Sequence, residues 1–518
     1  MRLALSALVL CACVGEMQGA STAVGPLCAQ TPRLSRLSGR HYRAIVTALV
    51  PDAGFTTLAV PFAQPRRTDL FTSWSGQASI GEYEVDEVWG ASETVATAWS
   101  AANPAACLGS TRTAECLRRV YVPALSLLWS REPTAPELED LEAQLTEAEQ
   151  ALEPAQASVA VLRRVLMGQQ FLFRHELGVG GSLSSAEVAA ALSFTLRDEP
   201  PDATLRALTK SDSLTDPTVI SAQAQRLLER PTEVPMLRRF LKELFEYEQT
   251  TRVFKSAADY PFHRPGELVD DTERVVEQLV SEHARSGLLR ALLTSDLVYV
   301  RPTTAASWAL PQSPDAGTFA HDPTRSGVLT HPAWLSAMSQ SDHNHLVRRG
   351  RFVRERLLCG EVPMLPGGVV PEIAKTPGLT LRQRNEQHSK DPACSGCHAL
   401  MDPLAMGFEA WDHVGRPQTM DNGSPVQTDG TLSGAGDSDG PYRDAPELLG
   451  RLAASPTVRA CWVKNLFRSV RGREVSAADA CELERLTALY ESSGEDTLAV
   501  IEAMFTSPEF LQRKQVGP

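Results

Sequence analysis

Long hydrophobic runs are almost absent from this chain of 518 residues. A transmembrane helix needs about 20 consecutive apolar residues, and no segment of the sequence has them. The apolar run at residues 3–10, which follows Arg2, is much shorter. A basic residue before a short apolar run is typical of a signal peptide. The sequence therefore predicts an exported chain without a membrane-spanning helix.

An excess of positive charge is also missing. The sequence has 50 Lys and Arg against 63 Asp and Glu, which gives a formal charge of −13 and a pI near 5.4. Broad binding to nucleic acid or to an anionic membrane requires the opposite balance. We therefore expect no nucleic-acid partner, and we expect membrane contact only through an N-terminal lipid anchor.

A Gly-rich phosphate loop is missing as well. The order Gly-x-Ser-x-Gly occurs once, as "GDSDG" at 436–440, but we expect a turn there rather than a nucleophile elbow, because Asp and Gly form turns unaided. Strand signals are restricted to residues 296–300 and to a hairpin within 415–432, where Asp-Asn-Gly separates two extended pieces. Elsewhere apolar residues recur every three or four positions. The sequence predicts a mainly α protein of two or three packed helical units, with a small β-hairpin near the C-terminal cysteine motif.

The helical period locates most of the expected elements. Ser184 with Glu187 forms a capping box at the start of one of them. Helices are predicted over residues 41–50, 135–152, 158–177, 184–196, 218–230, 234–247, 266–286, 343–358, 444–454, 457–471, 477–492 and 494–505.

Stretches rich in Pro, Gly and Ser interrupt this pattern, most clearly at 51–104, 301–324, 361–380 and 433–443. They divide the chain into a leader at 1–20, an N-terminal helical region at 21–155, a central helical domain at 156–300, a Cys-x-x-Cys-His domain at 325–432 and a C-terminal helical domain at 440–515.

The leader contains "LCAC" at residues 10–13, which is similar to a bacterial lipobox. In that interpretation Cys13 becomes the lipidated first residue of the mature protein. The alternative is cleavage after Ala20, which yields a free periplasmic protein, but Gln18 stands where a small residue is preferred. We expect a periplasmic or outer-membrane lipoprotein.

Export implies that most of the ten cysteines are oxidised. Proximity in the sequence suggests two disulfides and leaves a third pair over. These pairs are Cys107–Cys116 across a short loop, Cys461–Cys481 between two consecutive helices, and Cys28–Cys359.

The segment "DPACSGCHALMD" contains Cys394, Cys397 and His398 in the order Cys-x-x-Cys-His. This order is the pattern of covalent c-type haem attachment. Two intervening residues bring both sulfurs to the porphyrin vinyl groups from one helical turn, and the histidine points its ring nitrogen at the iron. The motif therefore predicts one haem c.

Two other interpretations of the motif remain open. Cys394 and Cys397 could form a disulfide with His398 merely nearby. Alternatively, Cys359, Cys394 and Cys397 could bind zinc together with His388 or His398, although an oxidising compartment disfavours free thiolates.

A haem iron also needs a second axial ligand or an open position. The candidates are His388, Met401, Met406 and His413. His388 is preferred because it is far enough from the motif to reach the other haem face, whereas Met401 lies on the same helical side as His398. Buried methionines otherwise fill cores.

Two further clusters have ordinary interpretations. "DHNH" at 342–345, with His343 and His345, is expected to form the first turn of a helix rather than a metal site. "RGRFVRER" at 349–356 is a basic helical face, which is expected to be solvated. The alternatives are ion pairs with the acidic remainder of the chain and contact with a haem propionate.

Several longer segments carry a resemblance. "GRFVRERLLCGEVPMLPGG", "TLRQRNEQHSKDPACSGCHALMDPLAMGFEAWDHVGRPQT" and "LRRVLMGQQFLFRHELG" resemble a family of exported bacterial proteins common in planctomycetes and myxobacteria. The family is described as cytochrome-associated and is built from domains of unknown function (numbers 1587, 1595, 1592, 1588 and 1585). The likeness covers most of residues 33–515 and is strongest over 346–420. It carries over Cys359, His388, Cys394, Cys397, His398, Asp402, Pro403, Glu409, Asp412 and Gly415.

The resemblance implies an architecture and a haem, but no reaction. The sequence as a whole predicts an exported c-type-cytochrome-like protein with one covalent haem, an electron-transfer or redox role and a redox partner of unknown identity. The alternative is a non-enzymatic surface or scaffold protein in which the motif is a structural disulfide or a zinc site. No catalytic residue is assigned.

Overall fold

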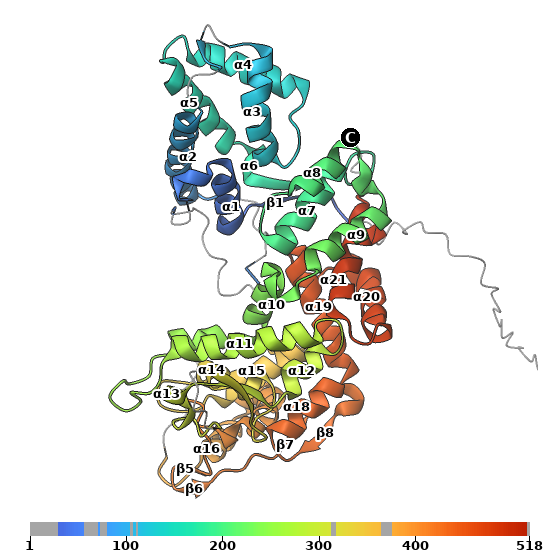
Figure 1. The fold of residues 1–518 in the computed structure, drawn as a ribbon. Coiled ribbons are helices and arrows are strands. Elements are labelled where there is room, and N and C mark those ends of the chain that lie inside the picture. Colours follow the sequence, from blue (N-terminus) through green and yellow to red (C-terminus); the bar gives the residue numbers. More distant parts are fainter. Residues whose placement is uncertain are drawn as a thin grey trace, which may run out of the picture.

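The computed structural model describes residues 30–55, 58, 71–72, 80–103, 107–109, 112–311, 317–363 and 376–514. Helices predominate in this part of the chain, and its sheets are four two-stranded antiparallel pairs. Figure 1 shows an elongated molecule in which three helical parts follow one another. The prediction of a mainly α, multi-helix fold with a small hairpin is confirmed.

The N-terminal part is the helical unit at the top of Figure 1. One face of each of its helices builds a separate core, where Trp99 and Tyr121 pack with ring centroids 5.2 Å apart. The disulfide Cys107–Cys116 ties the preceding loop to the first turn of α3. The helices are α1 (Gly39–Leu49), α2 (Glu82–Ala102), α3 (Ala114–Trp129), α4 (Ala135–Ala148), α5 (Pro154–Leu166) and α6 (Gln169–Leu172).

The middle part combines helices that are far apart in the sequence (Figure 1). Phe240 and Trp462 pack edge to face between α10 and α19, with ring centroids 5.0 Å apart. The helices are α7 (Ser185–Arg197), α8 (Ala203–Lys210), α9 (Pro217–Leu228), α10 (Pro235–Phe245), α19 (Pro456–Arg471), α20 (Ala480–Ser492), α21 (Thr497–Thr506) and α22 (Pro508–Leu511).

The lower part of Figure 1 contains the cysteine motif and shares one continuous hydrophobic core with the middle part. Its helices are α11 (Pro265–His283), α12 (Leu288–Thr294), α13 (Pro302–Ala305), α14 (Pro332–Ala337), α15 (Leu346–Phe352), α16 (Leu381–His388), α17 (Pro392–Met401) and α18 (Ala445–Ala454).

The strand pairs are short. In the predicted hairpin, Asn422 and Gly423 both have positive φ, 50° and 84°, as a tight hairpin turn requires. The pairs are β1 (Arg33–Arg36) with β2 (Phe173–Glu176), β3 (Leu297–Val300) with β4 (Thr318–His321), β5 (Met420–Asp421) with β6 (Ser424–Pro425), and β7 (Gly430–Leu432) with β8 (Gly440–Tyr442).

Two sequence predictions about these elements are wrong. The helix predicted over 158–177 ends at Leu166, because the later residues of that segment pair with β1 as strand β2. The predicted break at 51–104 contains the long helix α2, whose N-terminus is capped by a hydrogen bond from Gly81 N to Glu84 Oε2 at 2.8 Å.

None of the helices in the described part of the chain combines the length and the apolar character that crossing a membrane requires. The predicted leader at 1–20 and Cys13 lie outside the described residues.

Candidate functional site

The Cys-x-x-Cys-His motif lies in the first turns of α17. Asp391 caps this helix by accepting a hydrogen bond from Ala393 N at 2.9 Å, and a proline follows as the first helical residue, where a missing N–H costs nothing. Cys394, Cys397 and His398 are spaced by three and four positions, so they share one face of the helix.

The two cysteines of the motif are free thiols, and both are half-buried. The Sγ atom of Cys397 lies 3.8 Å from the carbonyl oxygen of Pro363, a weak contact because a thiol is a poor donor. The alternative prediction of a Cys394–Cys397 disulfide is therefore wrong. Both sulfurs are available for a covalent bond to another group.

His398 is buried and is held by a carboxylate. Its Nδ1 lies 2.9 Å and 3.1 Å from the two carboxylate oxygens of Asp402, which also accepts a hydrogen bond from Asn385 Nδ2. A carboxylate that accepts from Nδ1–H leaves the lone pair on Nε2, the state of a metal-binding histidine. The four-residue spacing from His398 to Asp402 was the sequence signal for this pair, which the sequence analysis did not use.

His388, the last residue of α16, lies beside His398. The two rings meet edge to face, with centroids 5.0 Å apart and an interplanar angle of 73°. Rings in direct contact cannot stand on opposite sides of an iron atom and its porphyrin plane. In this arrangement His388 covers His398, and ligation by both histidines would require the ring of His388 to move away.

Close packing against α15 positions the motif helix. A Cβ atom on Gly350 would lie 2.0 Å from the carbonyl oxygen of Met401, so only glycine permits this approach. Met401 is buried, and Met406 belongs to a small apolar cluster with Leu346 and Leu381. Both methionines thus occupy the packed interior on the side of the motif that faces α15 and α16.

A buried ion pair connects α15 to the segment after the motif. Arg349, which is 0% exposed, donates to Glu409 Oε1 at 3.2 Å and to Asn344 Oδ1 at 3.0 Å. Burial raises the pKa of Glu409 to about 7, against the opposing effect of Arg349. The expectation of a solvated basic face over 349–356 is therefore wrong for Arg349, because its partners draw it into the core.

His413 belongs to a different cluster. Its ring meets Tyr260 edge to face with centroids 5.0 Å apart, and burial followed by the charge of Lys255 lowers the pKa of His413 to about 4. The Nζ atom of Lys255 donates to Ser339 Oγ at 2.8 Å, and that hydroxyl lies 2.9 Å from the carbonyl oxygen of His413. These contacts tie His413 to the loop that contains Tyr260.

The "DHNH" segment forms a helix start, as expected. His343 Nδ1 lies 2.7 Å from Asp342 Oδ1, and the side chain of His345 accepts from Arg348 N at 3.4 Å as the N-cap of α15.

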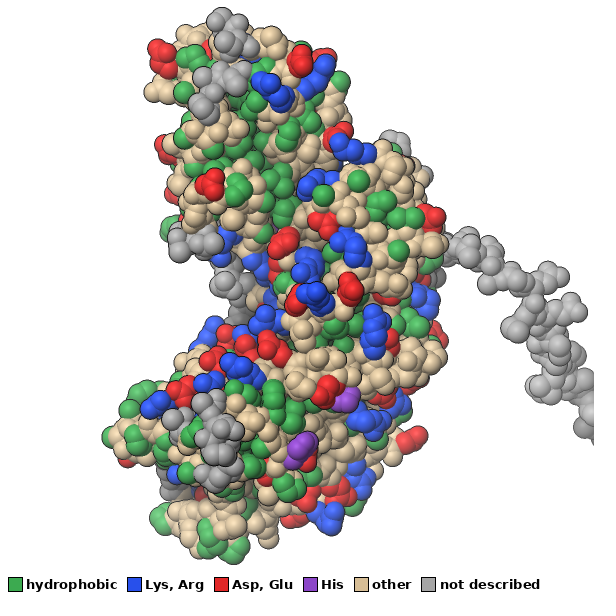
Figure 2. All heavy atoms as spheres, in the orientation of Figure 1, with side chains coloured by type: hydrophobic (Ala, Val, Ile, Leu, Met, Phe, Trp, Pro, Cys, Tyr) green, Lys and Arg blue, Asp and Glu red, His purple; other side chains and the backbone are tan. Residues whose placement is uncertain are grey.

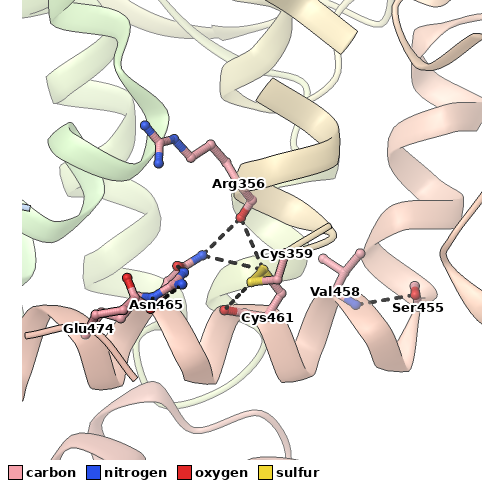
Figure 3. The surroundings of a disulfide bond; sticks show 8 residues. Arg356, Cys359, Ser455, Val458, Cys461, Asn465 and Glu474 are labelled. Atoms are coloured by element: carbon pink, nitrogen blue, oxygen red, sulfur yellow. Dashed lines mark hydrogen bonds and ion pairs between the residues drawn. A yellow bond between two sulfur atoms is a disulfide. The ribbon is translucent and has the colours of Figure 1, made fainter. Parts of the chain in front are cut away.

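A long-range disulfide holds the far end of the α15 segment. Cys359 is bonded to Cys461 of α19, 102 residues away. Figure 3 shows that the carbonyl oxygen of Arg356 lies beside it, where it accepts a hydrogen bond from Asn465 Nδ2 at 3.0 Å and contacts the Cys461 sulfur at 3.4 Å.

This bond overturns two predicted pairings, Cys461–Cys481 and Cys28–Cys359, because α19 turns Cys461 toward α15 rather than toward the next helix. Cys481 is itself disulfide-bonded, and Cys28 lies outside the described residues.

The predicted zinc site fails for the same reason. It required a free Cys359 thiolate together with Cys394, Cys397 and either His388 or His398, but the Cys359 sulfur is bonded to Cys461. Across the residues that the structure describes, no three His, Cys, Asp or Glu side chains converge as metal ligands.

Three family models match the chain. All three are described as proteins of unknown function: DUF1592 over residues 183–310, DUF1588 over 325–421 and DUF1585 over 439–510. These are three of the domains that the resemblance named. The second match contains the cysteine motif. No curated protein and no solved structure matches the chain.

Proposed function

Since the chain belongs to the family of proteins built from these domains of unknown function, we propose that it is an exported c-type-cytochrome-like protein. In this proposal Cys394 and Cys397 attach one haem covalently, and His398 binds the iron through Nε2. The role is electron transfer or other redox chemistry with a redox partner of unknown identity.

One observation carries the proposal. Two free, half-buried thiols share a helix face with a histidine whose Nδ1 is held by a carboxylate. A structural cysteine pair would be oxidised in an exported protein, as Cys107–Cys116 and Cys359–Cys461 are. The donor set thus fits covalent haem c: two sulfurs for the vinyl groups and one imidazole nitrogen for the iron.

The chain's own residues would do three things. The thiols of Cys394 and Cys397 would hold the haem through two thioether bonds, and adding an S–H group across a vinyl group would need no net oxidant. Asp402 keeps the proton on Nδ1 of His398 and leaves Nε2 free to donate its electron pair. The apolar cluster of Leu346, Leu381, Ala405 and Met406 would support the helices that hold these side chains. The haem supplies a one-electron couple whose potential the protein tunes.

His388 remains the proposed second axial ligand, and Met401 is the second candidate. The ring of His388 contacts the ring of His398, whereas Met401 is buried three residues after His398 on α17 itself. A coordination position left open is the alternative within this proposal.

Export and the lipid anchor on Cys13 are part of the same proposal. The disulfides support an oxidising compartment. The acidic balance of the chain supports a protein partner rather than nucleic acid.

The test is an absorption spectrum of the chain, purified from an exporting host with haem-attachment machinery and recorded before and after dithionite. We expect a Soret band, sharp reduced α and β bands, and colour that survives acid–acetone extraction. The double variant Cys394→Ser/Cys397→Ser is expected to lose all three. A featureless spectrum of the unmodified chain, both from this host and from its native source, would overturn the proposal.

A further inference from the structure

A cavity of 290 Å³ lies where the N-terminal unit meets the middle part. Its walls come from α1, α3, α6, β2 and α7, and most of them are apolar, including Leu128, Phe171 and Phe194. On the face drawn in Figure 2, apolar side chains gather where these two parts meet. An open, largely apolar cavity with a few polar groups is the usual form of a small-molecule site.

Most charged groups of the cavity wall already have partners. Arg131 donates two hydrogen bonds to the carboxylate of Glu137, at 2.8 Å and 2.6 Å. Glu187 accepts from Leu177 N at 2.7 Å and from Ser184 N and Oγ at 2.8 Å and 2.9 Å. Neither of these two charges is free to select a ligand.

Arg174 is different. Within the described residues its guanidinium makes one hydrogen bond, from Nη2 to Glu176 Oε1 at 3.2 Å, and its Nε is buried without a partner. Its side chain is still 13% accessible. A guanidinium carries five N–H donors, so Arg174 has donors to spare at the cavity.

The charge around Arg174 is unbalanced as well. The carboxylate of Glu176 also accepts from Arg33 Nε at 2.7 Å and from Arg513 Nη2 at 3.0 Å. Three guanidinium groups therefore share one carboxylate. Burial, with the like charge of Arg33, lowers the pKa of Arg174 against the opposing effect of Glu176. An added anion at Arg174 would relieve this excess of positive charge.

We propose that this cavity binds a small, mainly apolar carboxylate, whose head group pairs with Arg174 while its body lies against Leu128, Phe171 and Phe194. The volume sets the size. At about 30 Å³ for each water-sized group, 290 Å³ accommodates about ten non-hydrogen atoms, which is the size of octanoate. This inference is independent of the haem.

The experiment is isothermal titration calorimetry of the full chain with octanoate, octanol and octylammonium, which share one apolar body and differ in the head group. We expect octanoate to bind at least about tenfold more tightly than the other two, the effect of one charge-assisted hydrogen-bonded pair. Equal binding of octanol, or no binding of octanoate at millimolar concentration, would overturn the proposal.

Two variants and one control locate the site. Arg174→Met should weaken octanoate about tenfold and leave octanol unchanged, and Ala190→Leu, which fills the cavity from α7, should abolish binding of octanoate. Arg164→Met, at an exposed arginine of α5 away from the cavity, should bind like the unmodified chain. Unchanged octanoate binding in Ala190→Leu would place the ligand elsewhere. If Arg174→Met does not fold, the comparison of octanoate with octanol and octylammonium, together with Ala190→Leu, still tests the proposal.

Discussion

Cys359 and Cys461 lie 102 residues apart and are joined, whereas Cys394 and Cys397 lie on one helical turn and are not. The joined pair connects the segment that follows α15 to α19, and it thereby links the region matched by DUF1588 to the region matched by DUF1585. The sulfurs of the unjoined pair lie on one face of α17, which they share with His398. Spacing in the sequence is therefore a poor guide to which cysteines are structural.

The difference has a physical origin. A disulfide between distant segments removes much conformational entropy from the unfolded chain, whereas one across a single helical turn removes little. A bond between Cys394 and Cys397 would thus contribute little to stability.

The largest expected effect separates the two pairs by haem content. Cys394→Ser/Cys397→Ser should remove all covalent haem, whereas Cys359→Ser/Cys461→Ser should keep most of the haem bound per folded molecule, because its sulfurs are not at the site. The measurement is the reduced α-band absorbance per mole of protein after acid–acetone extraction. Equal loss in both variants would mean that the two pairs act as one site.

The next effect separates them by stability. Loss of the Cys359–Cys461 bond should lower the free energy of unfolding by about 5 kcal/mol, the magnitude for a loop of this length. Chemical denaturation of haem-free protein measures it. Cys394→Ser/Cys397→Ser should change the value by less than about 0.5 kcal/mol, and a larger loss there would show that the free thiols are structural.

A smaller effect concerns the packing that positions the free pair. Gly350→Ala places a Cβ against the backbone of Met401 and should cost about 1–3 kcal/mol of stability. The matched control is Gly396→Ala, between the two cysteines, where an added Cβ meets no atom within 4 Å. The control should stabilise α17 by up to about 1 kcal/mol. Thermal unfolding of the haem-free variants tests both, and a neutral Gly350→Ala would contradict the close approach of α15 and α17.

The smallest effect concerns the electronic setting of His398. Asp402→Asn removes the negative charge beside Nδ1, so the imidazole donates less electron density and the oxidised iron loses more stabilisation than the reduced iron. The midpoint potential should rise by about 60 mV for a tenfold change in relative affinity. A redox titration followed at the α band measures it, with Asp412→Asn as the control, because the carboxylate of Asp412 pairs with Arg416 and with backbone N–H groups of its own turn. A haem-loaded variant of unchanged potential would show that Asp402 does not tune the iron.

The features that the sequence predicted are encoded by neighbouring residues. The capping box of Ser184 and Glu187, the turn at Asn422–Gly423 and the Cys-x-x-Cys-His face of α17 each need only a few adjacent positions. The misjudged features depend on distant partners. Strand β2 was assigned to a helix because its partner β1 lies about 140 residues earlier, and Arg349 was placed in solvent because its partner Glu409 is 60 residues away.

The candidate site divides in the same way. Its two sulfurs and its imidazole follow from one local motif. Three other features depend on the packing of segments that are separate in the sequence. They are the contact of His388 with His398, the close approach of α17 to Gly350 and the disulfide of Cys359.

One further contact has a consequence for how the protein is made. Lys514 N donates to the carbonyl oxygen of Gln30 at 2.7 Å, and Arg513 joins Glu176 beside β1. The first and last described residues thus complete the same junction. During synthesis the core of the middle part cannot be completed before α19–α22 have been made. Until then, the apolar faces of α7–α10 that pack against those helices stay exposed. During that interval the exposed apolar faces are prone to aggregate.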